Sequence, residues 1–445
     1  MITYFFIAPY FTALFFLVTL LAILYCGLQA SFRRLPIFFL YNALAVLTLG
    51  LAPSLAYLLQ ATLPAEKVLQ PMPISASWYF SYVLPILVAI ALGTVPWSKQ
   101  ANSNDQDLIQ AIKQALQKQS YLPFTLLLFG TLMYFCTPFL PGALSQIGVF
   151  SGMVLWVGLL HLFFSAWSWQ VKTVVLVAAA AFMLIRALQS TFFGDLFVWP
   201  LWMMLYLQTR YHWSKKTLVS VGGITALCLA LTLVWKYDYR ERVMEKTGDS
   251  YTKKFSDTVK DWAKDPWKTK RWQQALDRFN QGNHLAQVYR WVPKEEHYAR
   301  GETIMQAIKA SLIPRFFWPD KPRAGGFHIW SRFTGNPLSP NVSMNIGMPG
   351  EAYANFGPWL ALLVVFVWVR FLYFLYHGLR QLALRHYPLL WLWIPLIFYP
   401  LMDQENDLVT ILNHAVKGTV FTLVFCWCLF KISRYLPAGK QANQE

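Results

Sequence analysis

Charged side chains are scarce in this sequence of 445 residues. Only 13% of the residues are charged, whereas an ordinary soluble domain carries about 25%. Hydrophobic residues make up 56% of the chain, and the mean hydropathy is +0.38. A soluble fold of this composition would expose large apolar patches, which soluble monomers avoid. The composition therefore excludes a soluble enzyme, a nucleic-acid-binding domain and a disordered scaffold, and it indicates a polytopic membrane protein.

The sequence also has few residues in patterns that bind metals or form disulfides. Its five cysteines all fall in apolar stretches, so we expect neither a disulfide framework nor a CxxC metal site. The eight histidines never occur at HxxxH or HExxH spacing, and no GxSxG motif is present. We therefore expect no metal, no cofactor and no serine nucleophile.

Long apolar runs are the main feature that is present. A span needs about 20 apolar residues, and the sequence predicts eleven such spans, at 4–26, 36–59, 77–97, 121–141, 147–169, 173–189, 191–208, 217–235, 356–378, 388–403 and 418–436. The fold predicted from them is an all-α polytopic membrane protein. Residues 1–235 would form an N-terminal bundle of about eight helices, 236–355 one large hydrophilic segment, and 356–445 about three further helices with a tail.

The distribution of lysine and arginine predicts the orientation. These residues concentrate in every second short loop and in the C-terminal tail, and basic short loops stay in the cytoplasm. We therefore expect the N-terminus outside, the C-terminus in the cytoplasm, and segment 236–355 outside. The net charge of +17 then indicates contact with anionic lipid headgroups and not with nucleic acid.

The large external segment has the pattern of a folded, surface-seeking region. Residues 253–280 alternate cationic clusters with tryptophan and phenylalanine, which is typical of amphipathic helices in a headgroup layer, here broken at Pro266. Residues 302–313 predict a helix that ends before Pro314. The cytoplasmic stretch 98–120 reads as a short solvated helix.

Cations and aromatic rings are interleaved later in this segment. One guanidinium group can bind two phosphate oxygens at once. Aromatic rings stack on sugars or lie at the lipid interface. The same residues could instead rest on anionic headgroups without binding a specific ligand. The cations are Arg290, Arg300, Arg315, Lys321, Arg323 and Arg332, and the aromatic residues include Tyr289, Trp291 and Trp318.

Two stretches carry a resemblance to a known family. Residues 312–322 (LIPRFFWPDKP) and 347–357 (GMPGEAYANFG) resemble segments of the bacterial oligosaccharide repeat-unit polymerases, the Wzy-type O-antigen and exopolysaccharide polymerases. Some members also carry an Arg-x10-Gly pattern, which Arg290 with Gly301 and Arg315 with Gly326 both match. The resemblance implies a glycosyltransferase architecture of the GT-C kind in the bacterial inner membrane, with the large segment in the periplasm.

The resemblance implies a metal-independent transfer between two oligosaccharides, each linked to polyprenyl diphosphate. An acceptor hydroxyl would attack the anomeric carbon of the donor, and polyprenyl diphosphate would leave. Cations must stabilise the leaving diphosphate, and a carboxylate or a histidine must accept the hydroxyl proton. We expect Glu351, Arg290 and Arg315 to be catalytic, with Asp320 and Glu405 as other candidates for the base. The expected substrate-binding residues are Lys321, Arg323, Asp320, Trp318, Tyr353, Asn355 and Glu405.

Glu351 also has a purely structural interpretation, as a charge that complements the dipole of a neighbouring helix. Other functions stay open as well: a ligase that transfers a finished glycan once, a transporter or flippase of lipid-linked sugars, or a scaffold for an exopolysaccharide complex. The expected partners are the lipid-linked oligosaccharides, membrane lipids and a chain-length regulator protein.

Overall fold

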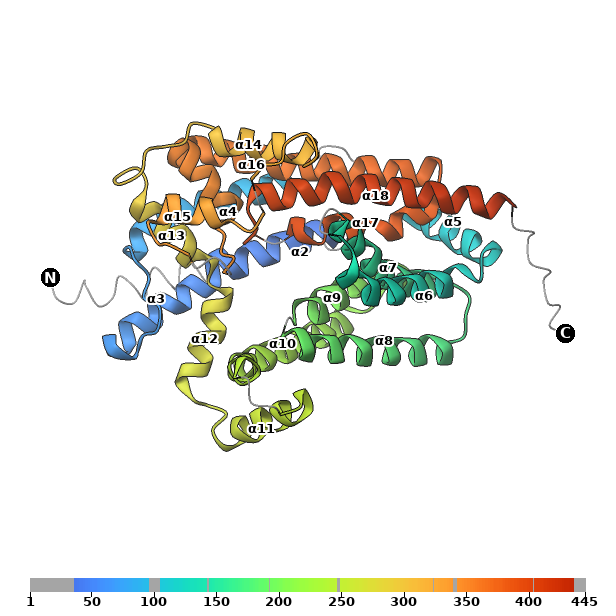
Figure 1. The fold of residues 1–445 in the computed structure, drawn as a ribbon, viewed down its shortest axis with the longest axis horizontal. Coiled ribbons are helices and arrows are strands. Elements are labelled where there is room, and N and C mark those ends of the chain that lie inside the picture. Colours follow the sequence, from blue (N-terminus) through green and yellow to red (C-terminus); the bar gives the residue numbers. More distant parts are fainter. Residues whose placement is uncertain are drawn as a thin grey trace. The chain divides into compact units, whose positions relative to one another are not determined.

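The computed structural model describes residues 36–95, 105–141, 144–191, 193–245, 249–322, 324–338, 342–402 and 404–435. Every regular element in these ranges is a helix (Figure 1). The chain forms two compact units, each built from separate stretches of sequence. The large hydrophilic segment 236–355 lies in the first unit together with candidate spans from both halves of the chain.

Eight helices of the described ranges are long and apolar enough to cross a membrane. The prediction of an all-α polytopic membrane protein is therefore confirmed, and eight of the predicted spans coincide with these helices. The predicted span 4–26 lies outside the described residues. Residues 191–208 correspond to helix α9 (Gly194–Tyr211), a continuous helix that contains Pro200 and is not one of the eight candidates. Residues 388–402 form three short helices.

The first unit contains residues up to 97, then 227–373 and 400–416. Helix α10 (Lys215–Met244) enters it, and helices α16 (Gly347–Arg385) and α18 (Leu408–Tyr435) begin in it. Its other elements are α2 (Pro36–Ala45), η1 (Val46–Leu51), α3 (Ala52–Thr62), η2 (Ala65–Lys67), α4 (Ala76–Thr94), α11 (Tyr251–Lys264), α12 (Thr269–Phe279), α13 (Gln281–Trp291), α14 (Glu302–Leu312), α15 (Phe327–Thr334) and η6 (Pro400–Met402).

The span Ile37–Thr62 is continuous but not uniform. Between α2 and α3 the chain forms a π-helix, η1, in which backbone hydrogen bonds are displaced and a carbonyl group becomes free for another donor. The hydroxyl of Tyr79, on α4, donates to the carbonyl oxygen of Leu49 at 2.7 Å. The irregular turn therefore fixes the contact between two spans.

The predicted amphipathic helices of the hydrophilic segment 236–355 are present. Helices α11 and α12 are separated near Pro266, as the sequence predicts, and Figure 1 shows them as two distinct helices after α10. Trp267, in the link between them, is 78% exposed and its ring stacks on Trp272 with centroids 5.7 Å apart. Helix α14 ends at Leu312, before Pro314 as predicted.

The second unit contains residues 98–226, 374–399 and the chain from 417 onward. Its elements, besides parts of α10, α16 and α18, are α5 (Asp105–Lys118), α6 (Leu122–Cys136), η4 (Thr137–Phe139), α7 (Ser145–Phe164), α8 (Trp169–Ser190), α9, η5 (Pro388–Trp393) and α17 (Ile394–Phe398). Helices α6 and α7 pack closely at Gly130, where a side chain would not fit. A Cβ at this position would lie 2.2 Å from the backbone nitrogen of Leu155. Small residues allow such close approach between membrane helices.

Helix α5 differs in one respect from the prediction of a solvated helix in the cytoplasmic loop 98–120. It is strongly amphipathic, and one of its faces is buried through Leu108, Ile112 and Leu116. The helix therefore packs on its own unit with one face and exposes only the other.

Candidate functional site

A kink at Gly357 divides helix α16 and positions the residues of the GMPGEAYANFG segment. Gly357 has φ 73° and ψ −176°. A Cβ at this position would lie 3.1 Å from the ring of Tyr298, so the kink needs glycine both for its backbone conformation and for this contact. The short helix before the kink carries three predicted site residues, and all of them are buried: Glu351, Tyr353 and Asn355.

The Glu351 side chain accepts a hydrogen bond from the N-terminal end of helix α18. Its Oε2 accepts a hydrogen bond of 3.0 Å from the backbone N–H of Leu408, the first residue of α18. Its Oε1 is buried and accepts no hydrogen bond of good geometry from the described residues, and the Thr303 hydroxyl lies beside the carboxyl group. The side chain is 0% exposed. A carboxylate at this place complements the positive end of the α18 dipole.

Asn355 connects the α16 helix to the turn before α14. Its Nδ2 donates to Thr303 Oγ1 at 2.7 Å and to the Glu351 carbonyl oxygen at 2.8 Å, and its Oδ1 accepts from Gly301 N–H at 3.0 Å. Arg300 donates its backbone N–H to the Asn355 carbonyl oxygen at 2.9 Å. All hydrogen-bonding groups of the Asn355 side chain are therefore used inside the protein.

Tyr353 belongs to a cluster of tyrosine rings. Its centroid lies 4.3 Å from that of Tyr289, 5.6 Å from Tyr82 and 6.1 Å from Tyr298. Its hydroxyl donates to the Val292 carbonyl oxygen at 3.4 Å. The ring is 2% exposed and packs against neighbouring rings, so in this conformation it offers no face to a sugar.

Asp407 is a second buried carboxyl group in this region, and it is not among the predicted site residues. It caps α18, because its Oδ1 accepts the backbone N–H of Thr410 at 3.1 Å, and it also accepts the N–H of Gly326. Burial raises the pKa of Asp407 above its usual value. The negative charge of Asp407 also acts on Glu351. The two acids therefore lie together at the first turn of α18.

The glycines of the two Arg-x10-Gly patterns have the same local structure. Gly301 (φ 92°) and Gly326 (φ 69°) are both left-handed residues immediately before a helix, α14 and α15 respectively. Each donates its N–H to a buried side chain, Gly301 to Asn355 and Gly326 to Asp407. A Cβ on Gly326 would lie 1.9 Å from Asn345 Oδ1. Both positions therefore require glycine for a physical reason.

The arginines of these patterns are on the surface. Arg290, at the end of α13, is exposed, and so is Arg315, whose Nη1 donates to the Pro319 carbonyl oxygen at 3.2 Å. Within the described chain neither of them forms an ion pair, whereas Arg332 pairs with Glu296 and Glu302. Arg290 and Arg315 are therefore exposed cations without a carboxylate partner among the described residues.

A further exposed cation, Arg300, is held in a strained conformation. Its φ is 51°, a region that residues other than glycine rarely occupy and that often marks functional sites. The sequence shows Arg300 only as one cation among several. Its left-handed backbone conformation occurs in the turn that the hydrogen bonds of Asn355 to Arg300 and Gly301 hold in place.

The remaining predicted residues divide between buried and exposed positions. Lys321 is buried, and its Nζ donates to the carbonyl oxygens of Ala310 and Ile313 (the latter at 3.1 Å), so it closes the C-terminal end of α14. Burial, and then the nearby Arg315, lower the pKa of Lys321. Asp320 is exposed and Trp318 half-buried. Arg323 lies outside the described residues.

Glu405, another candidate for the base, is already paired. Its Oε1 accepts from Arg278 Nη1 at 2.8 Å. Within the described ranges, no group of three or more histidine, cysteine, aspartate or glutamate side chains could hold a metal ion. Among the described residues, Asp320 is an exposed carboxylate close in sequence to the exposed Arg315.

Sequence comparison gives the family but no activity. A family model described as a domain of unknown function, DUF8712, matches residues 88–336, which is more than half of the chain, and the chain belongs to this family. No curated protein and no solved structure matches it.

Proposed function

We propose that this member of the DUF8712 family joins oligosaccharide repeat units carried on polyprenyl diphosphate, at the periplasmic face of the bacterial inner membrane, in O-antigen or exopolysaccharide biosynthesis. The observation that carries the proposal is that Arg290 and Arg315 are both exposed. Each begins an Arg-x10-Gly pattern with an internally bonded glycine, and each guanidinium is exposed without a carboxylate partner among the described residues.

The surroundings of Arg315 support a ligand that combines a diphosphate with a hydrocarbon chain. Phe316 and Phe317, the next two residues, are 87% and 74% exposed. Aromatic rings at this degree of exposure favour a lipid interface, and a guanidinium can bind two phosphate oxygens at once. A polyprenyl diphosphate carries both groups and would be bound by both.

In the proposed reaction Arg290, Arg315 and Arg300 stabilise the negative charge that develops on the leaving diphosphate. Asp320 is the candidate base, because it is exposed and lies shortly after Arg315 in the chain. Glu351 is assigned a positioning role in place of the catalytic role that the resemblance implies. Its burial and its hydrogen bond to Leu408 support this assignment.

The test replaces the arginines while keeping their charge. Lysine lacks the planar two-pronged geometry, and loss of one preorganised charge stabiliser typically lowers turnover about 100- to 1000-fold. Host cells that carry Arg290→Lys or Arg315→Lys should therefore retain mostly single repeat units on the carrier, as seen by gel analysis of extracted glycans. Arg240→Lys, at an exposed arginine of α10, is the matched control and should give normal polymer.

Two outcomes would change the proposal. Polymer of normal length from both arginine variants, with normal expression, would exclude the cationic site. A wild-type product consisting of one coupling and no ladder of lengths would assign the ligase reaction in place of polymerisation.

Transport of lipid-linked sugars is the weaker alternative. A transporter is expected to carry free charges among broken helices inside its bundle. The buried Arg370 of α16 lies in a candidate span, but its Nη1 donates to the Gly93 and Val95 carbonyl oxygens at 3.0 and 2.7 Å. Arg370 thus closes the C-terminal end of α4, which is a structural role.

A further inference from the structure

A small, partly open hollow with a cavity volume of about 70 Å³ lies in the second unit between helices α6, α8 and α9. Its polar lining comes from Tyr134, Arg186, Ser190 and Asp195, and its apolar lining includes Met183 and Leu196. Tyr134 lies near the C-terminal end of α6, Arg186 near that of α8, and Asp195 in the first turn of α9. The hollow is therefore at the end of these helices, and it plays no part in the site described above.

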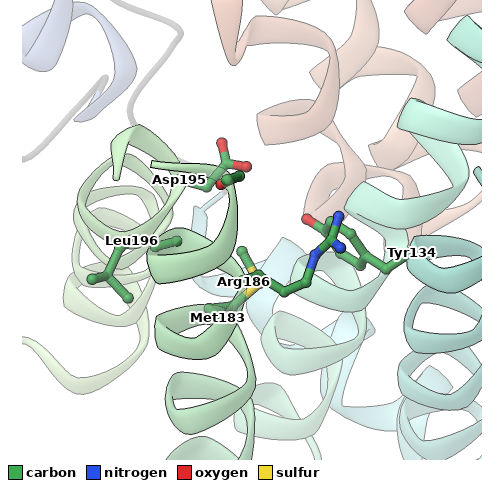
Figure 2. A pocket seen from close by; sticks show the side chains of 7 residues that line it. Tyr134, Met183, Arg186, Asp195 and Leu196 are labelled. Carbon is green, nitrogen blue, oxygen red and sulfur yellow. The ribbon is translucent and has the colours of Figure 1, made fainter. Parts of the chain in front are cut away.

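The cation and the anion of this hollow are not paired with each other. The Arg186 guanidinium carbon lies 5.9 Å from the centroid of the Tyr134 ring, while the Asp195 carboxylate accepts a hydrogen bond from Tyr399. Figure 2 shows the guanidinium turned toward Tyr134 and the Asp195 carboxylate separate from it, on α9. Opposite charges that share a hollow without forming an ion pair are complementary to a ligand that carries both signs.

The walls of the hollow indicate a lipid as the ligand. Helices α6 and α8 are candidate spans of which only 22% is buried. Their apolar side chains next to the hollow are turned outward, with Phe135 57% and Ile185 56% exposed. In a membrane such faces contact acyl chains, and the helix ends lie at the level of the headgroups. A charged residue close to the end of a span reaches toward that level.

We propose that the hollow binds the headgroup of a phosphoethanolamine lipid. The phosphodiester accepts hydrogen bonds from Arg186, and the primary ammonium donates to the Asp195 carboxylate. Phosphatidylglycerol has no cation for Asp195. Phosphatidylcholine has no N–H to donate and carries three methyl groups in place of the protons. The arrangement therefore selects the primary amine, and this inference does not depend on the proposed glycan chemistry.

The experiment is native mass spectrometry of the full-length protein in detergent, titrated separately with phosphatidylethanolamine, phosphatidylglycerol and phosphatidylcholine of identical acyl chains. The wild-type protein should bind phosphatidylethanolamine at the lowest concentration. Arg186→Gln should weaken this binding about tenfold, which corresponds to about 1.4 kcal/mol. Asp195→Asn keeps the acceptor for Tyr399 but should abolish the preference over phosphatidylglycerol.

The controls are Lys118→Gln and Asp107→Asn, a cation and an anion on the exposed side of α5 that do not line the hollow. Both should bind lipid as the wild type does. Arg186→Lys, which keeps the charge, should retain part of the binding and serves if Arg186→Gln does not fold. Competition by soluble glycerophosphoethanolamine would assign the site to the headgroup alone. Equal binding of the three lipids by the wild type, or unchanged preference in Asp195→Asn, would overturn the proposal.

Discussion

The acidic and the cationic residues of the candidate site differ in where their polar atoms point. Glu351 and Asp407 are buried and bind the first turn of α18 through backbone N–H groups. Arg290 and Arg315 are exposed, and neither is paired with a carboxylate within the described residues. By residue type alone, both the acids and the arginines are candidates for catalytic roles. Their exposure indicates that the acids hold the architecture while the arginines are available to a ligand.

The largest expected effect on stability comes from Gly326. Gly326 is the glycine of the Arg-x10-Gly pattern that begins at Arg315, and its N–H donates to the buried Asp407 carboxylate. Gly326→Ala would place a Cβ 1.9 Å from Asn345 Oδ1 and 2.4 Å from the Met344 carbonyl oxygen. The left-handed conformation costs about 1–2 kcal/mol and overpacking about 1–3 kcal/mol, so destabilisation of about 2–5 kcal/mol is expected. The measurement is the thermal unfolding midpoint of the purified protein in detergent.

Gly378→Ala is the matched control, because that position is helical and has open space around it. Alanine is favoured over glycine in a helix by about 1 kcal/mol, so the midpoint should stay the same or rise. Equal midpoints for the two alanine variants would contradict the tight packing at Gly326.

A smaller effect separates the structural role of Glu351 from a catalytic one. Glu351→Ala removes the acceptor of the Leu408 N–H, and an unsatisfied buried donor costs about 1–3 kcal/mol. Glu351→Gln keeps an acceptor oxygen and should preserve both stability and polymer length. If Glu351→Gln were stable but produced only single repeat units, Glu351 would be the base after all.

The smallest expected effect is on the pH dependence of stability. It tests whether a buried acid that does not bind the first turn of α18 destabilises the fold when it loses its proton. Burial raises the pKa of Asp277, on α12, to about 6. The folded protein therefore holds this proton over a range where the unfolded chain has lost it, and stability falls as pH rises from about 4 to about 6. Asp277→Asn should show a smaller decrease in unfolding midpoint between pH 4.5 and pH 7 than the wild type. Identical decreases would remove Asp277 from the pH response.

The helices were largely predictable from the sequence, because their signals are local. Apolar runs gave eight of the candidate spans, and Pro266 and Pro314 marked the ends of helices in the external segment. The predicted span 388–403 was less accurate, because Pro388, Pro395 and Pro400 divide it into short helices. Proline removes a backbone donor and interrupts a helix.

The candidate site was less predictable, because exposure depends on packing between distant segments. Glu351 reaches Leu408, and Asn355 reaches Gly301, across more than 50 positions of sequence. No local pattern indicates that these side chains are turned inward. The Arg-x10-Gly pattern was the most informative signal, since both of its glycines occupy positions that require glycine. Asp407 and Arg300 gave no such signal.

The π-helical turn Val46–Leu51 makes the position of Pro53 sensitive to the number of residues in the span Ile37–Thr62. A π turn holds one residue more than an α turn, and one extra residue rotates everything beyond it by about 100° around the helix axis. Pro53 lies beyond the turn, and its Cγ is so close to Gly282 that a Cβ there would lie 2.2 Å away. Losing a single residue from this turn would carry Pro53 away from Gly282. The number of residues between Val46 and Pro53 therefore sets where Pro53 lies against Gly282, independently of which apolar residues fill the turn.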